Sequence, residues 1–354
     1  MNPSAAIDRF EQRHAWLGFP LAVIYKYFDD QGAYLAALIT YYGFLSLFPL
    51  LLLLVTILGY TLDGDPTLRA ELLNSAVSRF PGLSGQTKGL EALSGSWVAL
   101  VIGIVGSLYG ALGVSQATQN ALNKAWGVSR NQRPNPIMAR LRGLMFLVVA
   151  GAALLATAAL SVLTTHMHAL GSHLGLLFFV PVRLLIIAVN AALFLAAFRV
   201  LTARDVSERQ ALPGAIVAAV AWQALQEFTN LYFTEKVSKS SAAYGVFAVV
   251  LGLLAYIYLA AVSVVIAAEV NVVKAERLWP RSLLTPFTDD VVLTDADRRA
   301  YASYPESERH KGFERVHVTF DRSDPAHDTA AAGDGAVSAD PPPEDDRRSV
   351  EGAG

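Results

Sequence analysis

The sequence contains no cysteine and few charged residues, and both absences narrow the classes of protein that it can encode. Without cysteine the chain can form neither disulfide bonds nor thiolate metal sites. Charged residues make up only 16% of the chain, whereas soluble domains carry about 25%. Hydrophobic residues make up 53% and are gathered in long blocks. This composition argues against a soluble domain and favours a membrane protein.

The chain also lacks the common motifs of nucleotide and metal chemistry. It contains no GxxxxGK[ST] phosphate-binding loop and no HExxH pair. A basic stripe interleaved with aromatic residues, which is typical of nucleic-acid binding, is missing as well. We therefore expect a protein that is not an enzyme, with no cofactor, no metal site and no nucleic-acid partner.

Six apolar blocks are long enough to cross a membrane, which takes about 20 helical residues. They predict an all-α integral membrane protein with a membrane domain over residues 33–272. Residues 1–32 mix charge with aromatic side chains and predict a cytoplasmic, interfacial helix that precedes the first span. The predicted spans cover residues 33–60, 97–118, 143–166, 177–201, 211–233 and 244–272.

The positions of Lys and Arg predict the orientation of these spans, because short cytoplasmic loops are enriched in both residues. Fourteen lie in the N-terminal segment, the second and fourth loops and the stretch after the last span. Six lie on the opposite side. This distribution predicts that both termini are cytoplasmic.

The C-terminal segment, residues 273–354, is expected to be cytoplasmic and largely disordered. From Ser282 to the end it contains 8 Lys and Arg but 16 Asp and Glu, a net charge of −8. It is also rich in Pro, Ala and Gly. Such a composition buries too little apolar surface to offset the entropy of ordering.

Polar residues on one face of the fifth predicted span are the strongest indication of a functional site. Gln223, Glu227 and Asn230 have the spacing i, i+4, i+7, and Gln226 lies beside them. A carboxyl group in a span costs roughly 3 kcal/mol or more. The face predicts either a substrate or proton pathway or hydrogen bonding between helices. Arg183, in the fourth span, either reaches the membrane interface or pairs with Glu227.

The first and sixth predicted spans carry further candidates. Pro49 and Gly43 predict a kink in the first span. Such a break either lines a binding cavity or is a packing feature. Glu269, near the cytoplasmic end of the sixth span, predicts either a salt bridge with a loop arginine or an inner gate. The hydroxyl groups beside the kink belong to Thr40, Tyr41 and Ser46.

Small residues in the second predicted span indicate close helix packing. Gly103, Gly106 and Gly110 follow one another at helical spacing. Such glycines allow two helices to approach closely, either within one chain or in a homo-oligomer. Packing within the chain is the more common use of this pattern.

Four segments of the chain combine apolar runs with distinctive polar and glycine residues. In chain order they are DDQGAYLAALITYYGFLSLFPLLLLL (29–54), SQATQNALNKAWGV (115–128), PGAIVAAVAWQALQEFTNLYF (213–233) and AYGVFAVVLGLLAYIYLAAVSVVIAAEVN (243–271). Together these segments resemble the YihY/BrkB family of bacterial inner-membrane proteins. Ala255 and Ala267 stand where family members often carry Trp and Gly.

The resemblance implies a multi-pass protein of the bacterial plasma membrane. Members of this family have been described as virulence factors, and some carry an older ribonuclease BN label. Our leading hypothesis is a transporter or exporter of a small solute or lipid-like substrate, in contact with membrane lipids. The alternatives are a non-transporting envelope scaffold or assembly factor and, third, a membrane-associated ribonuclease.

Overall fold

The computed structural model describes residues 15–61, 97–149, 151, 175–236, 242–283, 285 and 291–320. These residues form helices and connecting segments and contain no strand, which confirms the predicted all-α class for this part of the chain. Residues 136–149 are also helical. The remaining elements are α2 (Ala15–Asp29), α3 (Gly32–Thr61), α6 (Trp97–Ala125), the 3-10 turn η1 (Arg130–Gln132), α8 (Gly175–Val200), α9 (Glu208–Lys236), α10 (Ala242–Glu276) and α11 (Asp295–Ser307).

Four of the described helices contain a segment that is long and apolar enough to cross a membrane. These segments are Gly32–Leu53, Trp97–Ala125, Arg183–Val200 and Val250–Glu276. Helix α9 covers the fifth predicted span but is not among them, because Gln and Glu residues interrupt its apolar surface. Most of the third predicted span, 143–166, lies outside the described residues. The chain is therefore a membrane protein, and the number of six spans stays a prediction.

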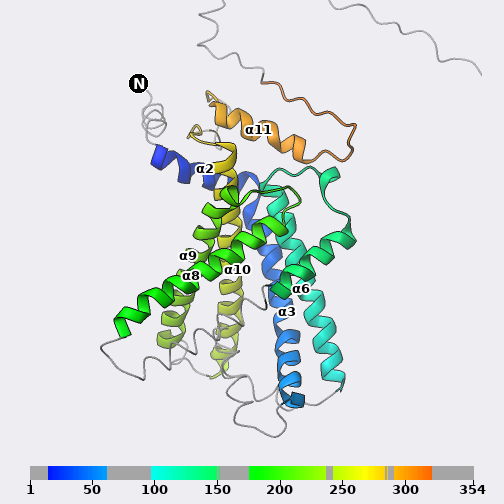
Figure 1. The fold of residues 1–354 in the computed structure, drawn as a ribbon, viewed down its shortest axis with the longest axis vertical. Helices are drawn as coiled ribbons and strands as arrows, with labels where there is room; N and C mark the ends of the chain where they lie inside the picture. The colour runs from blue at the N-terminus through cyan, green and yellow to red at the C-terminus, as the bar shows by residue number, and fades with distance from the viewer. Residues whose placement is uncertain are drawn as a thin grey trace, which may run out of the picture. The chain divides into compact units, whose positions relative to one another are not determined.

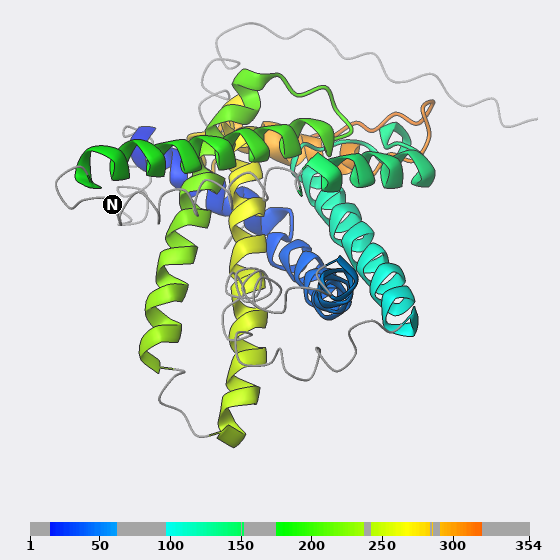
Figure 2. The same cartoon turned by 60° about the horizontal axis from the view of Figure 1, so that its bottom comes forward.

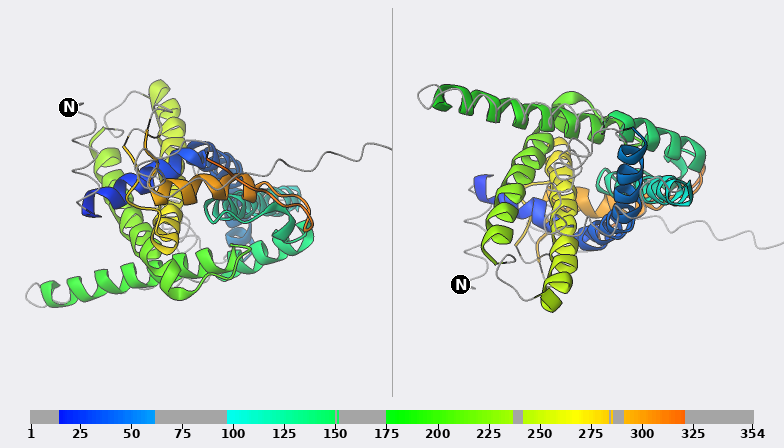
Figure 3. Two further views of the ribbon diagram at one scale, coloured as in Figure 1. Left: turned by 90° about the horizontal axis from the view of Figure 1, so that it is seen from above. Right: turned by 90° about the horizontal axis from the view of Figure 1, so that it is seen from below.

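Helix α10 joins two pairs of helices. It contacts α3 and α6, which pack on each other, and it also contacts α9, which packs on α8. Figure 1 shows α3 beside α6 in one part of the bundle and α9 beside α10 in the other. Figure 2 shows the same grouping from a second direction. Helices α2 and α11 both lie at one end of the bundle, where the views of Figure 3 place them across the other helices.

Helices α3 and α6 approach closely because glycines of α6 leave room for side chains of α3. A Cβ atom on Gly110 would lie 2.3 Å from Cβ of Ser46 and 2.6 Å from its Cα. The predicted glycine spacing is thus used for packing within the chain. Successive glycines of α6 and their neighbours on α3 are Gly103 with Leu53, Gly106 with Pro49, Gly110 with Ser46, and Gly113 with Tyr42.

Helices α9 and α10 meet at Gly214, near the start of α9. Its backbone N–H donates to Oδ1 of Asn271 at 2.6 Å, and Asn271 is fully buried. A Cβ atom on Gly214 would lie 2.0 Å from the carbonyl oxygen of Ala267. The contact therefore requires glycine at this position.

The expectation of a largely disordered C-terminal segment is wrong for residues 295–307, which form α11. Thr294 begins this helix with a capping box, in which its hydroxyl accepts from the Asp297 N–H and the Asp297 carboxylate accepts from the Thr294 N–H. Ala296 and Ala300 are buried on the face of α11 that packs against the rest of the protein. The composition of the whole segment concealed this short element. Residues 1–14, the predicted outer loop over 62–96 and residues 321–354 lie outside the described part.

Candidate functional site

The two charged residues predicted in the fourth and fifth spans form an ion pair between α8 and α9. Nη2 of Arg183 lies 2.5 Å from Oε1 of Glu227. The side chains are 39% and 49% exposed, so protein atoms do not enclose the pair. Arg183 is eight residues from the start of α8, and Glu227 is nine from the end of α9. At 1.5 Å per residue both lie about 12–14 Å from those helix ends, at matching depth.

The other polar residues of α9 lie near this pair along the helix. Gln223 and Gln226 are half-buried. Trp222, beside Gln223, packs on Tyr256 of α10, with the two ring centres 6.2 Å apart. Asn230 lies in the part of α9 where side chains are not described. The described residues thus bring Arg183 and Glu227 together, while the function of this face stays a prediction.

The polar residues near the predicted kink of α3 use their hydroxyl groups locally. Oγ1 of Thr40 donates to the carbonyl oxygen of Ala36 at 2.7 Å, and Oγ of Ser46 donates to that of Gly43 at 2.9 Å. Tyr41 is 59% exposed. Helix α3 continues through Pro49 as one helix. The hydroxyls of Thr40 and Ser46 therefore satisfy backbone carbonyls of their own helix.

A cavity of about 340 Å³ lies between α3, α6 and residues 133–139. Its polar wall comes from carboxamide side chains of α6, including Gln116 and Asn120, and from Arg133. Nη1 of Arg133 donates to Oδ1 of Asn120 at 2.9 Å. Leu38 and Tyr42 of α3 form the apolar wall. The volume falls in the range that binds small ligands, and the wall offers both donors and acceptors.

A buried cluster of three charged residues lies where α2 meets α10. Lys26, Asp30 and Glu269 are 3%, 1% and 0% exposed. Nζ of Lys26 donates to Oδ2 of Asp30 and lies 3.9 Å from Oε2 of Glu269. Lys26 also lies 5.2 Å from the ring centre of Tyr304 on α11. Glu269 thus pairs with a lysine of the N-terminal helix rather than with a loop arginine.

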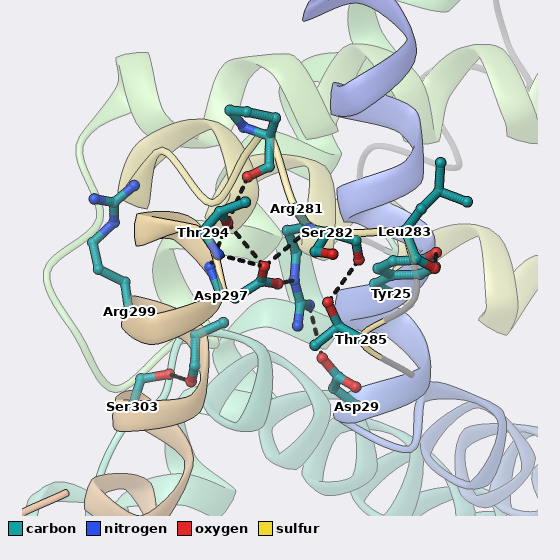
Figure 4. Close-up of polar contacts among 12 residues, drawn as sticks. Tyr25, Asp29, Arg281, Ser282, Leu283, Thr285, Thr294, Asp297, Arg299 and Ser303 are labelled. Carbon is teal, nitrogen blue, oxygen red and sulfur yellow. Dashed lines mark hydrogen bonds and ion pairs between the residues drawn. The ribbon is translucent and has the colours of Figure 1, made fainter. Parts of the chain in front are cut away.

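Arg281 forms a second buried cluster, which connects α2 to α11 (Figure 4). Its Nε donates to Oδ1 of Asp297 and its Nη1 donates to Oδ2 of Asp29, both at 2.8 Å. The hydroxyl of Tyr304 donates to the same Asp29 oxygen at 2.8 Å. Oδ2 of Asp297 accepts from the backbone N–H of Ser282 at 2.9 Å. These contacts fix α11 and the segment after α10 against α2.

The charges of this second cluster shift the pKa values of its members. Burial by itself lowers the pKa of the Arg281 guanidinium, but the hydrogen bonds to Asp297 and Asp29 outweigh it and raise the pKa above its usual range. Burial and the negative charge of Asp29 raise the pKa of Tyr304. Arg281 therefore stays a cation and Tyr304 a neutral hydrogen-bond donor.

The sequence identified Glu269 but missed its partners and the Arg281 cluster. Lys26 and Asp30 have the i, i+4 spacing of a helical ion pair, directly before a long apolar block. That spacing is a signal that could have indicated a buried pair. Arg281 and Asp297 offer no comparable signal, because only the fold brings them together.

Comparison with known proteins assigns the chain to a family. The sequence model of the family described as "Virulence factor BrkB" matches residues 23–286, about three quarters of the chain. The chain belongs to the BrkB family. The family match includes Lys26, Asp30, Glu269, Arg183 and Glu227 but ends before α11. The position of Asp297 thus lies outside the matched region of this BrkB-family protein.

One relative of this BrkB-family protein is the "Putative ribonuclease-like protein YfkH" of Bacillus subtilis (strain 168). The two sequences are 25% identical over 268 residues, which cover 71% of this chain and 93% of the relative. No solved structure matches the chain. The family and the apolar helices together support a membrane protein, consistent with the bacterial inner membrane.

Proposed function

We propose that this protein transports a small solute or a lipid-like substrate across the plasma membrane, and that Arg183 and Glu227 lie on the route. The observation that carries the proposal is their ion pair, within helices of the membrane domain and with both side chains about half open. An ion pair that only holds two helices together does not need side chains this exposed.

The exposed side of the Arg183–Glu227 ion pair must face lipid, water or a polar substrate. A charged side chain facing lipid near the middle of a span costs about 2.5–3.5 kcal/mol. Water or a polar substrate beside Arg183 and Glu227 would remove that cost. An open ion pair at this depth is therefore better explained by a polar pathway than by a lipid-facing surface. The cavity beside Arg133 supports the same proposal, because it offers a second polar surface of suitable volume for a small molecule.

The name of the Bacillus relative makes a ribonuclease the second candidate. In the part of the chain that the structure describes, no three His, Asp or Glu residues are placed to hold a metal ion. Phosphodiester hydrolysis commonly uses such a group. The described geometry therefore supports transport better than RNA cleavage.

The test compares metabolite and lipid pools in cells and medium of a deletion strain complemented with wild type or variants. We expect Glu227→Gln and Arg183→Gln to accumulate the same compound as the deletion strain. The matched control is Arg199→Gln. Arg199 pairs with Glu208 at 2.7 Å between the same two helices, but at the opposite end of α8. This control should resemble wild type.

Two results would overturn the proposal. Equal pools in the deletion strain and wild type, with the protein expressed, would remove the transport function. If the exchange of both charges, Arg183→Glu with Glu227→Arg, restored full function to the inactive single variants, the pair would be a structural contact rather than part of the route.

A further inference from the structure

The cluster of Lys26, Asp30 and Glu269 holds more acidic groups than its basic group can balance. Two carboxyl groups face one ammonium group, and all three side chains are at least 97% buried. If both carboxyls were ionised, the cluster would carry one uncompensated negative charge. A buried charge without a partner costs several kcal/mol, and such groups usually become neutral instead.

Neighbouring charged groups do not supply the missing positive charge. Asp29 lies nearby on α2, but it is already held by Arg281. On α6, Lys124 acts on Asp30 and forms an ion pair with Glu308 at 3.4 Å. Tyr304 of α11 lies over Lys26 as a neutral phenol.

Two further phenols complete the surroundings. Tyr27 of α2 lies near Tyr258 of α10, and burial raises the pKa of Tyr27 to about 12. Tyr27 therefore stays neutral over the physiological range. Among the described residues, Lys26 is the cation that forms ion pairs with Asp30 and Glu269, and Lys124 acts on Asp30 from farther away.

The hydrogen bonds of the cluster are incomplete in a way that a proton would correct. Oδ1 of Asp30 and both carboxylate oxygens of Glu269 are buried and have no hydrogen-bond partner among the described residues. Both carboxyl groups lie against the same atom, Nζ of Lys26, which donates to Oδ2 of Asp30 and lies 3.9 Å from Oε2 of Glu269. An ionised carboxylate can only accept, whereas a protonated carboxyl also donates. One proton between the two groups would supply the missing donor and neutralise the excess charge.

We propose that Asp30 and Glu269 form a proton-binding site, in which one proton is shared between the two carboxyl groups beside the Lys26 ammonium. At neutral pH the site then contains one cation, one carboxylate and one carboxylic acid. Burial raises the pKa of Asp30, against the opposing charge of Lys26, in agreement with this assignment. The inference does not rest on the proposed transport function, because proton binding is measured without a substrate.

The first experiment detects the bound proton by infrared spectroscopy of the purified full-length protein in lipid nanodiscs at neutral pH. A protonated carboxyl group has a C=O stretching band separate from the carboxylate bands. We expect this band in wild type and its loss in both Glu269→Gln and Asp30→Asn. The control is Glu276→Gln, since Glu276 lies on the same helix but is 42% exposed and pairs with Arg204. The control should retain the band.

A second measurement covers the case in which a variant disturbs the fold. Thermal unfolding is followed as a function of pH for wild type and Glu269→Gln, which mimics the neutral acid. Wild type should lose stability as the pH rises and the shared proton is withdrawn from the folded state. The variant keeps a neutral group there, so its melting temperature relative to wild type should increase with pH.

Three results would overturn the assignment. A carboxylic acid band that persists in both Glu269→Gln and Asp30→Asn would place the proton elsewhere. A parallel pH dependence of melting in wild type and Glu269→Gln would show that the pair does not titrate. A band that appears only when sodium is replaced by choline would show that an alkali cation, rather than a proton, neutralises the site.

Discussion

Replacing Gly110 by alanine tests the close contact of α3 and α6 directly. The new Cβ atom would lie 2.3 Å from Cβ, 2.6 Å from Cα and 2.9 Å from the backbone nitrogen of Ser46. Carbon atoms in contact are normally about 3.5–4.0 Å apart. The helices must therefore separate by roughly 1 Å, since backbone atoms of Ser46 cannot rotate away as a flexible side chain would. Forcing extra atoms into a packed contact costs about 1–3 kcal/mol.

The loss should be measurable in a reversible unfolding experiment. Alanine gains up to about 1 kcal/mol over glycine in helix propensity, which partly offsets the overlap. Because the overlap involves backbone atoms of Ser46, we take the upper end of the packing cost, about 3 kcal/mol. After the gain in helix propensity we expect Gly110→Ala to lose about 2 kcal/mol, an approximately 30-fold change in the unfolding equilibrium. The assay is unfolding of the purified protein in mixed micelles by increasing SDS, followed by tryptophan fluorescence.

The matched control is Gly151→Ala. Gly151 is also helical, but among the residues that the structure describes a Cβ atom there would have no neighbour within 4 Å. This variant should be as stable as wild type or slightly more stable. Equal stability of Gly110→Ala and Gly151→Ala would contradict the described packing of α3 on α6.

Three further predictions concern the contacts of α9 and α11. Arg281→Gln should release α11, because it leaves the buried Asp297 carboxylate without its cation at a cost of about 3–5 kcal/mol. Hydrogen exchange of α11 amides should therefore accelerate, whereas Lys274→Gln, at an exposed position, should leave it unchanged. The hydrogen bond from Arg130 lowers the pKa of Glu308 in the folded protein. The ionised Glu308 side chain therefore stabilises the fold at pH values above its pKa in the unfolded protein. This stabilisation is lost as the pH falls through the pKa of Glu308 in the folded protein. Melting temperatures of wild type and Glu308→Gln should therefore differ at neutral pH and converge in acid. Gly214→Ala should lower the melting temperature, because its Cβ would meet a backbone carbonyl oxygen at 2.0 Å.

The helical elements could be predicted well, because apolar blocks longer than about 20 residues have few other structures available. The blocks around Ala36 and Leu253, for example, belong to α3 and α10 as expected. Whether α9 crosses the membrane was harder to predict, because its polar face lowers the mean hydropathy by which a span is recognised. The position of Arg183 beside Glu227 follows from helix pairing, which the sequence allowed but did not determine.

The buried clusters depend on contacts between distant parts of the chain, and for that reason composition predicted them poorly. Helix α11 lies in a segment of net negative charge, and its stability comes from Arg281 and two small buried alanines rather than from an apolar stripe. Its capping box, Thr294 followed three residues later by Asp297, was nevertheless readable in the sequence. The neighbours of Glu269 could not be identified from α10 alone, because Lys26 belongs to α2 and Asp30 to the turn that follows it.

Glycines of α6 face larger residues of α3, and this packing limits how the protein can change shape. Each α3 residue from Tyr42 to Leu53 that faces a glycine occupies a hollow of its own. Sliding one helix along the other would require these residues to leave all their hollows at once. Helices α3 and α6 should consequently move as one rigid body. Any alternation between inward- and outward-open states would then have to hinge where this body meets α10, rather than within the body itself.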